Sequence, residues 1–273
     1  MSEPKQTRLK YPADWVKRHQ AGPPISLVTA YDATMARWAA TSNVDAILVG
    51  DSLGMVIQGR TSTMGVTLDE MIYHARLVRR GAPDTFVIAD MPFGSYQGGI
   101  DEALANAFRM MKECEPDAIK VEGATPEILT IIDRLTNNGV PVMGHLGFTP
   151  QSVLQQGGFR VQGRTPEQKD LLTRQSRDLE AAGVFGMVFE LVVTEVAGDI
   201  TKQLSVPTIG IGAGPDTSGQ VLVMHDLLGL DSTFHPRFVK RFADLSGEIH
   251  SALDAFHEEV QNKSFPDDSH SFR

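Results

Sequence analysis

The chain has 273 residues, 41% of them hydrophobic, which is enough for one large α/β domain with a substantial core. Its net charge of −9 and its pI near 5.3 argue against nucleic acid or an anionic membrane as the main partner, because both require a basic surface. The single cysteine, Cys114, excludes an intramolecular disulfide and a thiolate cluster for a metal, and it fits a reducing cytosol.

The N-terminal segment 1–24 is predicted to be a polar tail followed by a helix near Pro12–His19, which would cap the bottom of the domain. The first ten residues contain no apolar run of the kind found in secretory signals, and no apolar stretch reaches membrane-spanning length. We therefore expect a soluble, cytoplasmic protein.

From Ile25 onward, hydrophobic runs alternate with segments that carry helix signals, as repeated βα units require. The predicted strands are Ile25–Tyr31, Ala46–Ser52, Thr85–Met91, Ala118–Glu122, Pro141–Leu146, Met187–Leu191, Pro207–Ile211 and Val221–Met224.

The helix signals lie between these runs. Thr67 and Glu70 have the spacing of a capping box, and Gly81 is predicted to end that helix in a left-handed conformation. Thr125 and Thr165 each precede a proline, which is typical of a cap followed by the first helical residue.

Eight βα units favour a single-domain (β/α)8 TIM barrel over residues 25–263, followed by a C-terminal tail at residues 264–273. A doubly wound open sheet is the alternative, but no GxGxxG motif follows the first strand. The last long helix, about Ala243–Lys263, has an apolar face that either packs on the barrel or forms an oligomer contact.

Acidic residues end three of the apolar runs, at Asp51, Asp90 and Glu122. Active sites of such barrels lie at the C-terminal ends of the strands, where neighbouring strands are about 5 Å apart. Three converging carboxylates suit Mg²⁺, which prefers hard oxygen ligands. The alternative is that each acid caps a helix or turn.

Two further charged residues lie on these strands. Lys120 is two residues from Glu122 on one strand, so both side chains face the same way, and Lys120 can bind a substrate oxygen beside Ser52. The alternative is a salt bridge to Glu122. A Schiff base is disfavoured, because the nearby acids would keep the amine protonated. Glu190 lies in an apolar run, where burial suits a general base. Its alternative is a buried ion pair with an arginine.

His145 ends the fifth strand and is interpreted first as a hydrogen-bonded core residue and second as a ligand. The glycine-rich run Gly210–Gly214 follows the seventh strand, where barrels often bind phosphate, although it can equally be a tight turn.

Several longer motifs occur in a fixed order. They are TAYD (Thr29–Asp32), VGDSLGM (Val49–Met55), Gln58-Gly59, HARLVRRGAP (His74–Pro83), AD-x-PF (Ala89–Phe93), KVEG (Lys120–Gly123), PVMGHLGFTPQSV (Pro141–Val153), GG-x-x-VQGR (Gly157–Arg164), GIGAG (Gly210–Gly214), GQ-x-LVMHD (Gly219–Asp226) and HSF (His270–Phe272). With these motifs, nearly the whole chain resembles the ketopantoate hydroxymethyltransferase family.

The resemblance implies transfer of a one-carbon unit from 5,10-methylenetetrahydrofolate to 3-methyl-2-oxobutanoate, in the pantothenate pathway. It also implies a Mg²⁺-dependent barrel that assembles as a homodecamer. The metal ligands of the family correspond to Asp51, Asp90 and Glu122, and the contacts to the keto acid correspond to Asp51, Ser52, Asp90 and Lys120. The proton acceptor corresponds to Glu190.

The chain departs from the family where Leu191-Val-Val follows Glu190 in place of a Cys-Val-Pro-like run, and it ends HSFR where HSFH is expected. Two other functions stay open. One is a Mg²⁺-dependent carbon–carbon lyase of the phosphoenolpyruvate/isocitrate lyase type. Such lyases usually have a reactive cysteine in a loop, whereas Cys114 lies in a predicted helix. The other is a barrel that binds a keto acid without catalysis.

Overall fold

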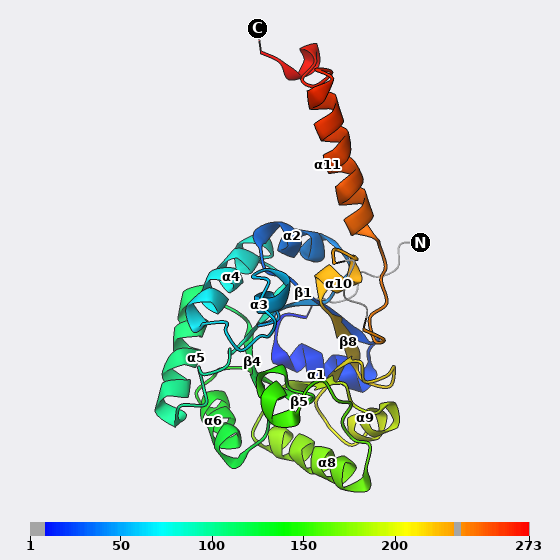
Figure 1. The fold of residues 1–273 in the computed structure, drawn as a ribbon. Helices are drawn as coiled ribbons and strands as arrows, with labels where there is room; N and C mark the ends of the chain where they lie inside the picture. The colour runs from blue at the N-terminus through cyan, green and yellow to red at the C-terminus, as the bar shows by residue number, and fades with distance from the viewer. Residues whose placement is uncertain (1–8, 232–235, 273) are drawn as a thin grey trace, which may run out of the picture. The chain divides into compact units, whose positions relative to one another are not determined.

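Eight parallel strands close into a barrel in the order β1 to β8, with helices around the outside (Figure 1). The strands are β1 (Ile25–Thr29), β2 (Ala46–Val49), β3 (Phe86–Asp90), β4 (Ala118–Glu122), β5 (Val142–Gly147), β6 (Gly186–Glu190), β7 (Thr208–Ile211) and β8 (Gly219–Leu222). The predicted (β/α)8 barrel is confirmed, and the open-sheet alternative is wrong.

The computed structural model describes residues 9–231 and 236–272, so residues 1–8 of the predicted N-terminal tail and Arg273 lie outside the described residues. The chain divides into two compact units, Met1–Val223 and Met224–Arg273. The predicted boundaries at residues 24 and 263 stay predictions.

The first unit contains nine α-helices within its described part and one short 3-10 helix. They are α1 (Pro12–Ala21), α2 (Ala33–Thr41), α3 (Leu53–Val56), α4 (Leu68–Gly81), α5 (Ile100–Cys114), α6 (Pro126–Asn137), η1 (Pro150–Ser152), α7 (Val153–Gln156), α8 (Pro166–Ala181) and α9 (Thr194–Thr201).

Each predicted strand overlaps an observed strand, but the last one is displaced. The prediction was Val221–Met224, whereas β8 begins at Gly219, and Met224 starts a helix. A Cβ atom at Gly219 would meet the carbonyl oxygen of Ile25, so the close pairing of β8 with β1 needs a glycine there. A glycine followed by glutamine has no hydrophobic signature, which explains why the start of β8 was missed.

The helix caps form as predicted. Oγ1 of Thr67 accepts from the main-chain N–H of Glu70 at 3.2 Å, and Oε2 of Glu70 accepts from the N–H of Thr67 at 2.7 Å. Thr125 and Thr165 cap α6 and α8 through their side chains.

The prediction for Gly81 is wrong, because it is the last residue of α4 and not a left-handed stop. Its lack of a side chain instead lets α4 approach the main chain of α2 at Ala33.

The N-terminal helix α1 closes the bottom of the barrel. The ring of Trp15 is fully buried, with its centroid 5.2 Å from that of Phe86 and 5.5 Å from that of Phe185. Phe86 starts β3 and Phe185 immediately precedes β6, so these contacts lie at the N-terminal ends of the strands. The core at this end leaves the opposite end of the barrel for chemistry.

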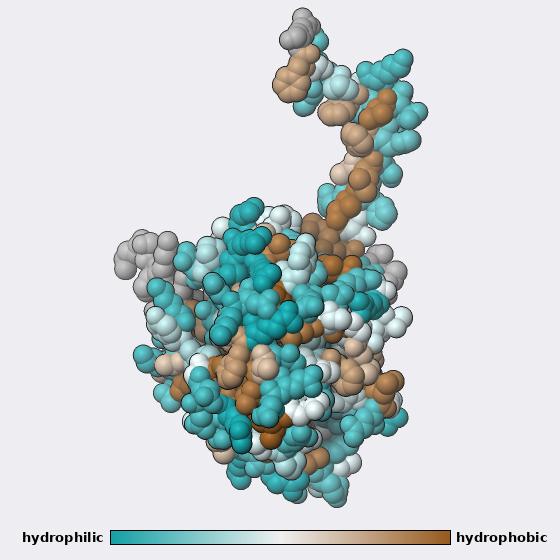
Figure 2. All heavy atoms as spheres, turned by 90° about the vertical axis from the view of Figure 1, so that its left-hand side faces the viewer, coloured by the Kyte–Doolittle hydropathy of each residue, from teal (hydrophilic) through white to brown (hydrophobic). Residues whose placement is uncertain are grey.

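The second unit contains α10 (Met224–Leu227), α11 (Leu245–Gln261) and η2 (Asp268–His270). None of the residues of α11 is buried, and its apolar residues are visible along its length in Figure 2. The two interpretations of this apolar face, packing on the barrel or an oligomer contact, stay predictions. Among the described helices, none has the length and apolar character needed to cross a membrane.

Candidate active site

The three predicted metal ligands come together at the C-terminal ends of neighbouring strands. Asp90 and Glu122 are the last residues of β3 and β4, and Asp51 lies in the turn just after β2. All three are buried, and the main-chain N–H of Asp51 donates to Oδ2 of Asp90 at 3.1 Å. The barrel therefore gathers three carboxylates where parallel strands end side by side.

Lys120 lies among these acids. Its Nζ atom is 3.2 Å from Oδ1 of Asp90 and 3.8 Å from Oε1 of Glu122, so its closer carboxylate partner is Asp90. Burial opposes the charge on this amine, but Asp90 and the other acids outweigh burial and raise the pKa of Lys120 above its ordinary value. The amine is therefore held as a cation, which disfavours a Schiff base.

His145 joins two acids that belong to different strands. Its Nδ1 atom lies 3.3 Å from Oε1 of Glu122, and its Nε2 atom lies 3.3 Å from Oε2 of Glu190. Burial and the nearby Lys120 oppose a charge on the ring, but Glu122 and Glu190 outweigh them and raise the pKa of His145 to about 9. His145 is thus a buried residue with polar partners, in line with its first interpretation, but its connection to two acids of the site was not predicted.

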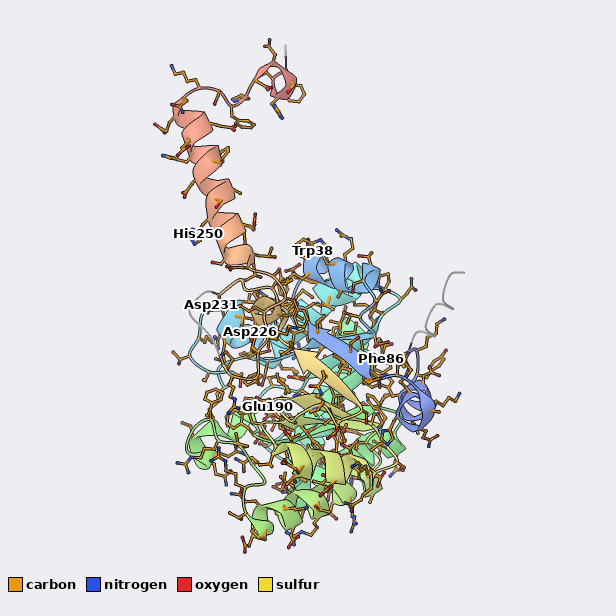
Figure 3. The ribbon with its side chains drawn as sticks, turned by 90° about the vertical axis from the view of Figure 1, so that its right-hand side faces the viewer. Trp38, Phe86, Glu190, Asp226, Asp231 and His250 are labelled. Atoms are coloured by element: carbon orange, nitrogen blue, oxygen red, sulfur yellow. The ribbon has the colours of Figure 1, made fainter. Side chains whose placement is uncertain are left out.

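Glu190 is the last residue of β6, and 15% of its side chain is exposed. Within residues 9–231 and 236–272 its ionic partner is His145, and no arginine of these ranges forms the alternative buried pair. The end of β6 is held tightly, because Gly147 packs against the carbonyl of Glu190 and the N–H of Phe148 donates to that carbonyl at 2.8 Å. Figure 3 shows Glu190 and Phe86 toward opposite ends of the barrel, with Phe86 on the side of α1.

Ser52 follows Asp51 directly and precedes α3. Its Oγ atom is 2.8 Å from the hydroxyl of Tyr31, which fixes the serine beside the acids. A Cβ atom at Gly50 would lie only 2.7 Å from Oγ of Ser52, so a side chain at this position would displace the serine hydroxyl. The structure thus brings Ser52 to the same strand ends as Lys120.

The chemistry of the cluster fits a divalent cation. Burial first, and then the charges of Asp90 and Glu122, raise the pKa of Asp51 well above its ordinary value. Oδ1 of Asp90 and Oε1 of Glu122 are buried and accept no hydrogen bond of good geometry; their nearest cations are Nζ of Lys120 at 3.2 Å and Nδ1 of His145 at 3.3 Å. Within residues 9–231 and 236–272, no three Asp, Glu, His or Cys side chains already have the geometry of a metal ligand set. The cluster therefore suits a divalent cation because its carboxylate oxygens are hard, buried and negatively charged, and not because they already have the geometry of bound ligands.

The glycine-rich run after β7 has the properties of a tight turn. Gly212 and Gly214 have positive φ angles of 64° and 83°, which favour glycine. A Cβ atom at Gly210 would lie 2.8 Å from Oγ1 of Thr217, so a side chain there would displace this hydroxyl. Ligand binding by this run stays a prediction.

A family model described as ketopantoate hydroxymethyltransferase matches residues 11–268. The chain belongs to the ketopantoate hydroxymethyltransferase family. It is 50% identical to the 3-methyl-2-oxobutanoate hydroxymethyltransferase of Leptospira biflexa over 256 residues, which cover 94% of this chain and 96% of that protein. It is 51% identical to the enzyme of the same name from Anaeromyxobacter sp. (strain K) over 257 residues, covering 93% and 84% of the two chains.

Solved structures outside the ketopantoate hydroxymethyltransferase family share the fold. The phosphoenolpyruvate phosphomutase of Streptomyces platensis subsp. rosaceus superposes with a TM-score of 0.62 at 14% identity, covering 93% of this chain and 88% of the other. A phosphonopyruvate hydrolase in complex with oxalate and Mg²⁺ has a TM-score of 0.61 at 10% identity, covering 96% and 93%. At these identities the likeness is one of fold alone.

Proposed function

We propose that the protein transfers a hydroxymethyl unit from 5,10-methylenetetrahydrofolate to 3-methyl-2-oxobutanoate and forms 2-dehydropantoate, the precursor of pantothenate. The observation that carries this proposal is the placement of Glu190 beside a buried cluster of three acids and one lysine, to which His145 connects it. Such a site can hold a keto acid next to a general base. Relatives that are about half identical bear the name of this activity.

In this proposal Asp51, Asp90 and Glu122 hold Mg²⁺. Bound there, the ion supplies positive charge to the oxygens of the keto acid, which stabilises the negative charge that develops as an enolate forms.

The keto acid is oriented by residues of this chain. Asp51 and Asp90 face it from the ends of neighbouring strands, and the ammonium group of Lys120 attracts its carboxylate. Ser52 donates a hydrogen bond from the turn before α3, while Tyr31 holds its hydroxyl in place. These contacts fix the C3–H bond in one direction.

Glu190 takes the C3 proton. The ring of His145 lies between Glu190 and Glu122, with 3.3 Å from Nε2 to Oε2 of Glu190 and 3.3 Å from Nδ1 to Oε1 of Glu122, so its positive charge favours the ionised form of the base. The resulting enolate attacks the methylene carbon delivered by the folate. With one water consumed, the net products are 2-dehydropantoate and tetrahydrofolate.

The folate co-substrate, a homodecameric assembly and a cytoplasmic location belong to the same proposal. The resemblance to the family supports the first two. A chain with one cysteine and no disulfide of its own supports the third.

The test is exchange of the C3 proton of 3-methyl-2-oxobutanoate in D₂O, followed by NMR with Mg²⁺ and with a chelator. We expect exchange with the metal, its loss with the chelator, and product only when methylenetetrahydrofolate is added. Tight binding of the keto acid without exchange would instead indicate a non-catalytic barrel.

Cleavage of a 2-hydroxy or dicarboxylic acid without folate would indicate the lyase. The environment of Cys114 argues against the lyase, because the thiol of this residue is not placed to react. Its thiol is buried at the end of α5, donates to the carbonyl of Met110 at 3.1 Å, and has a pKa raised by burial to about 12. A thiol in this state is a poor acid or nucleophile.

A further inference from the structure

Gln151 contacts two of the three acids although its residue type gave no signal in the sequence. It lies in η1, in the loop after β5, and is buried. Its main-chain N–H donates to Oε2 of Glu122 at 3.1 Å, and its side-chain Nε2 donates to Oδ2 of Asp51 at 2.9 Å. One residue therefore bridges acids that come from β4 and from the turn after β2.

Tyr96 fixes which end of the Gln151 amide faces Asp51. The hydroxyl of Tyr96 accepts from the main-chain N–H of Glu122 at 3.2 Å and lies 2.6 Å from Oε1 of Gln151. Because this hydroxyl has one proton to donate, the proton goes to Oε1, and the NH₂ end of the amide turns away. That end also donates to the carbonyl of Met91 at 3.0 Å, which agrees with the same orientation.

The hydrogen bonds form a directed chain from the main chain of Glu122 through Tyr96 and Gln151 to the carboxylate of Asp51. Every donor and acceptor in it is buried at the strand ends, where an unpaired polar group is costly and a fully paired network is rigid. Three ionised carboxylates that are buried close together repel each other, because little solvent is present to screen their charges. The amide of Gln151 is a neutral donor to one oxygen of Asp51. It offsets part of that repulsion without adding a positive charge, which would compete with a bound cation.

We propose that Gln151 is a positioning residue: its amide, oriented by Tyr96, holds Asp51 and Glu122 in the relative placement that admits a divalent cation. This inference rests on the metal site of the proposed function. Partners that orient metal ligands in this way typically contribute a factor of about 10–100 to metal affinity.

The test is the affinity for Mn²⁺, used in place of Mg²⁺ and measured by the electron paramagnetic resonance signal of the free ion in the presence of 3-methyl-2-oxobutanoate. Gln151→Met keeps the length of the side chain and removes the amide. Gln156→Met is the matched control, since Gln156 ends α7, the short helix that follows η1, and its amide donates to Oγ1 of Thr149 at 3.0 Å rather than to an acid. Tyr96→Phe keeps the ring and removes the closer of two donors to Oε1 of Gln151; the other is Nε2 of Gln97 at 3.3 Å.

We expect the dissociation constant for Mn²⁺ to rise about 10–100-fold in Gln151→Met, to rise less in Tyr96→Phe, and to stay at the wild-type value in Gln156→Met. Thermal unfolding in a chelator should be alike for the Gln151 and Gln156 variants, which separates positioning from loss of fold. If Gln151→Met does not fold, the double variant Tyr96→Phe with Gln97→Leu decides, because it removes both donors to Oε1 of Gln151.

Wild-type affinity in both Gln151→Met and Tyr96→Phe overturns the inference and leaves the proposed function intact. A wild-type protein that binds no Mn²⁺ overturns the metal site itself, and the inference with it.

Discussion

The imidazole of His145 stands between Glu190 and Glu122, with Nε2 3.3 Å from one carboxylate and Nδ1 3.3 Å from the other. His145 lies opposite Glu122 in the register of β4 and β5, and Glu190 ends the strand on the other side of β5. The proposed base and a proposed metal ligand are thus connected through one ring, so a substitution of His145 should alter the environment of both carboxylates.

Replacing Glu190 by glutamine removes the proposed proton acceptor and preserves its shape. We expect the rate of C3 proton exchange in 3-methyl-2-oxobutanoate to fall by about 10²–10⁴-fold, the range typical of a lost general base. NMR in D₂O measures this rate. Glu195→Gln is the matched control, because Glu195 is exposed in the first turn of α9, and it should exchange at the wild-type rate. Full exchange in Glu190→Gln would remove this residue as the base.

The charge on His145 should make the stability of the metal-free protein depend on pH. Its pKa is raised from 6.5 to about 9 in the folded state, so the folded protein binds this proton more tightly than the unfolded chain does. The contribution is fully present below about pH 6.5 and is lost as the pH rises through about 9. Denaturant unfolding in a chelator should therefore show wild type losing stability over this interval relative to His145→Gln. Parallel pH profiles for the two proteins would contradict a charged His145.

Cys114 should be unreactive in the folded protein. Burial raises the pKa of its thiol to about 12, so almost no thiolate is present at pH 8. We expect negligible labelling by iodoacetamide at pH 8 in the native protein and complete labelling after unfolding, as measured by mass spectrometry. Rapid labelling of the native protein, or loss of C3 proton exchange in Cys114→Ala, would show that this cysteine is reactive or needed for activity and would support the lyase alternative.

Gly81 should tolerate no side chain. A Cβ atom there would collide with the main chain of α2 at Ala33, so Gly81→Ala should lower the free energy of unfolding by about 1–3 kcal/mol despite the better helix propensity of alanine. Gly247→Ala is the control, since Gly247 lies inside α11 with no atom within 4 Å of the added carbon, and it should leave stability unchanged or raise it. Denaturant unfolding measures both, and equal effects would refute the packing argument.

Local patterns in the sequence predicted most of the fold. Alternation of apolar runs and capped helical segments was enough for the barrel, because burial on both faces and the spacing of βα units are properties of neighbouring residues. The start of β8 escaped this reasoning, since Gly219 is required by the approach of Ile25 from β1 and not by any local hydrophobic pattern.

For the candidate site, local patterns were enough to locate Asp51, Asp90 and Glu122 at or just after the strand ends and to put Lys120 on the same face as Glu122. The partners of these residues could be identified only in the folded chain, where His145 contacts both Glu122 and Glu190, and Gln151 contacts both Asp51 and Glu122. A strand specifies where a side chain emerges, but a hydrogen bond depends on distances between strands and loops far apart in the chain. Those distances are set when the barrel closes, and no local pattern contains them.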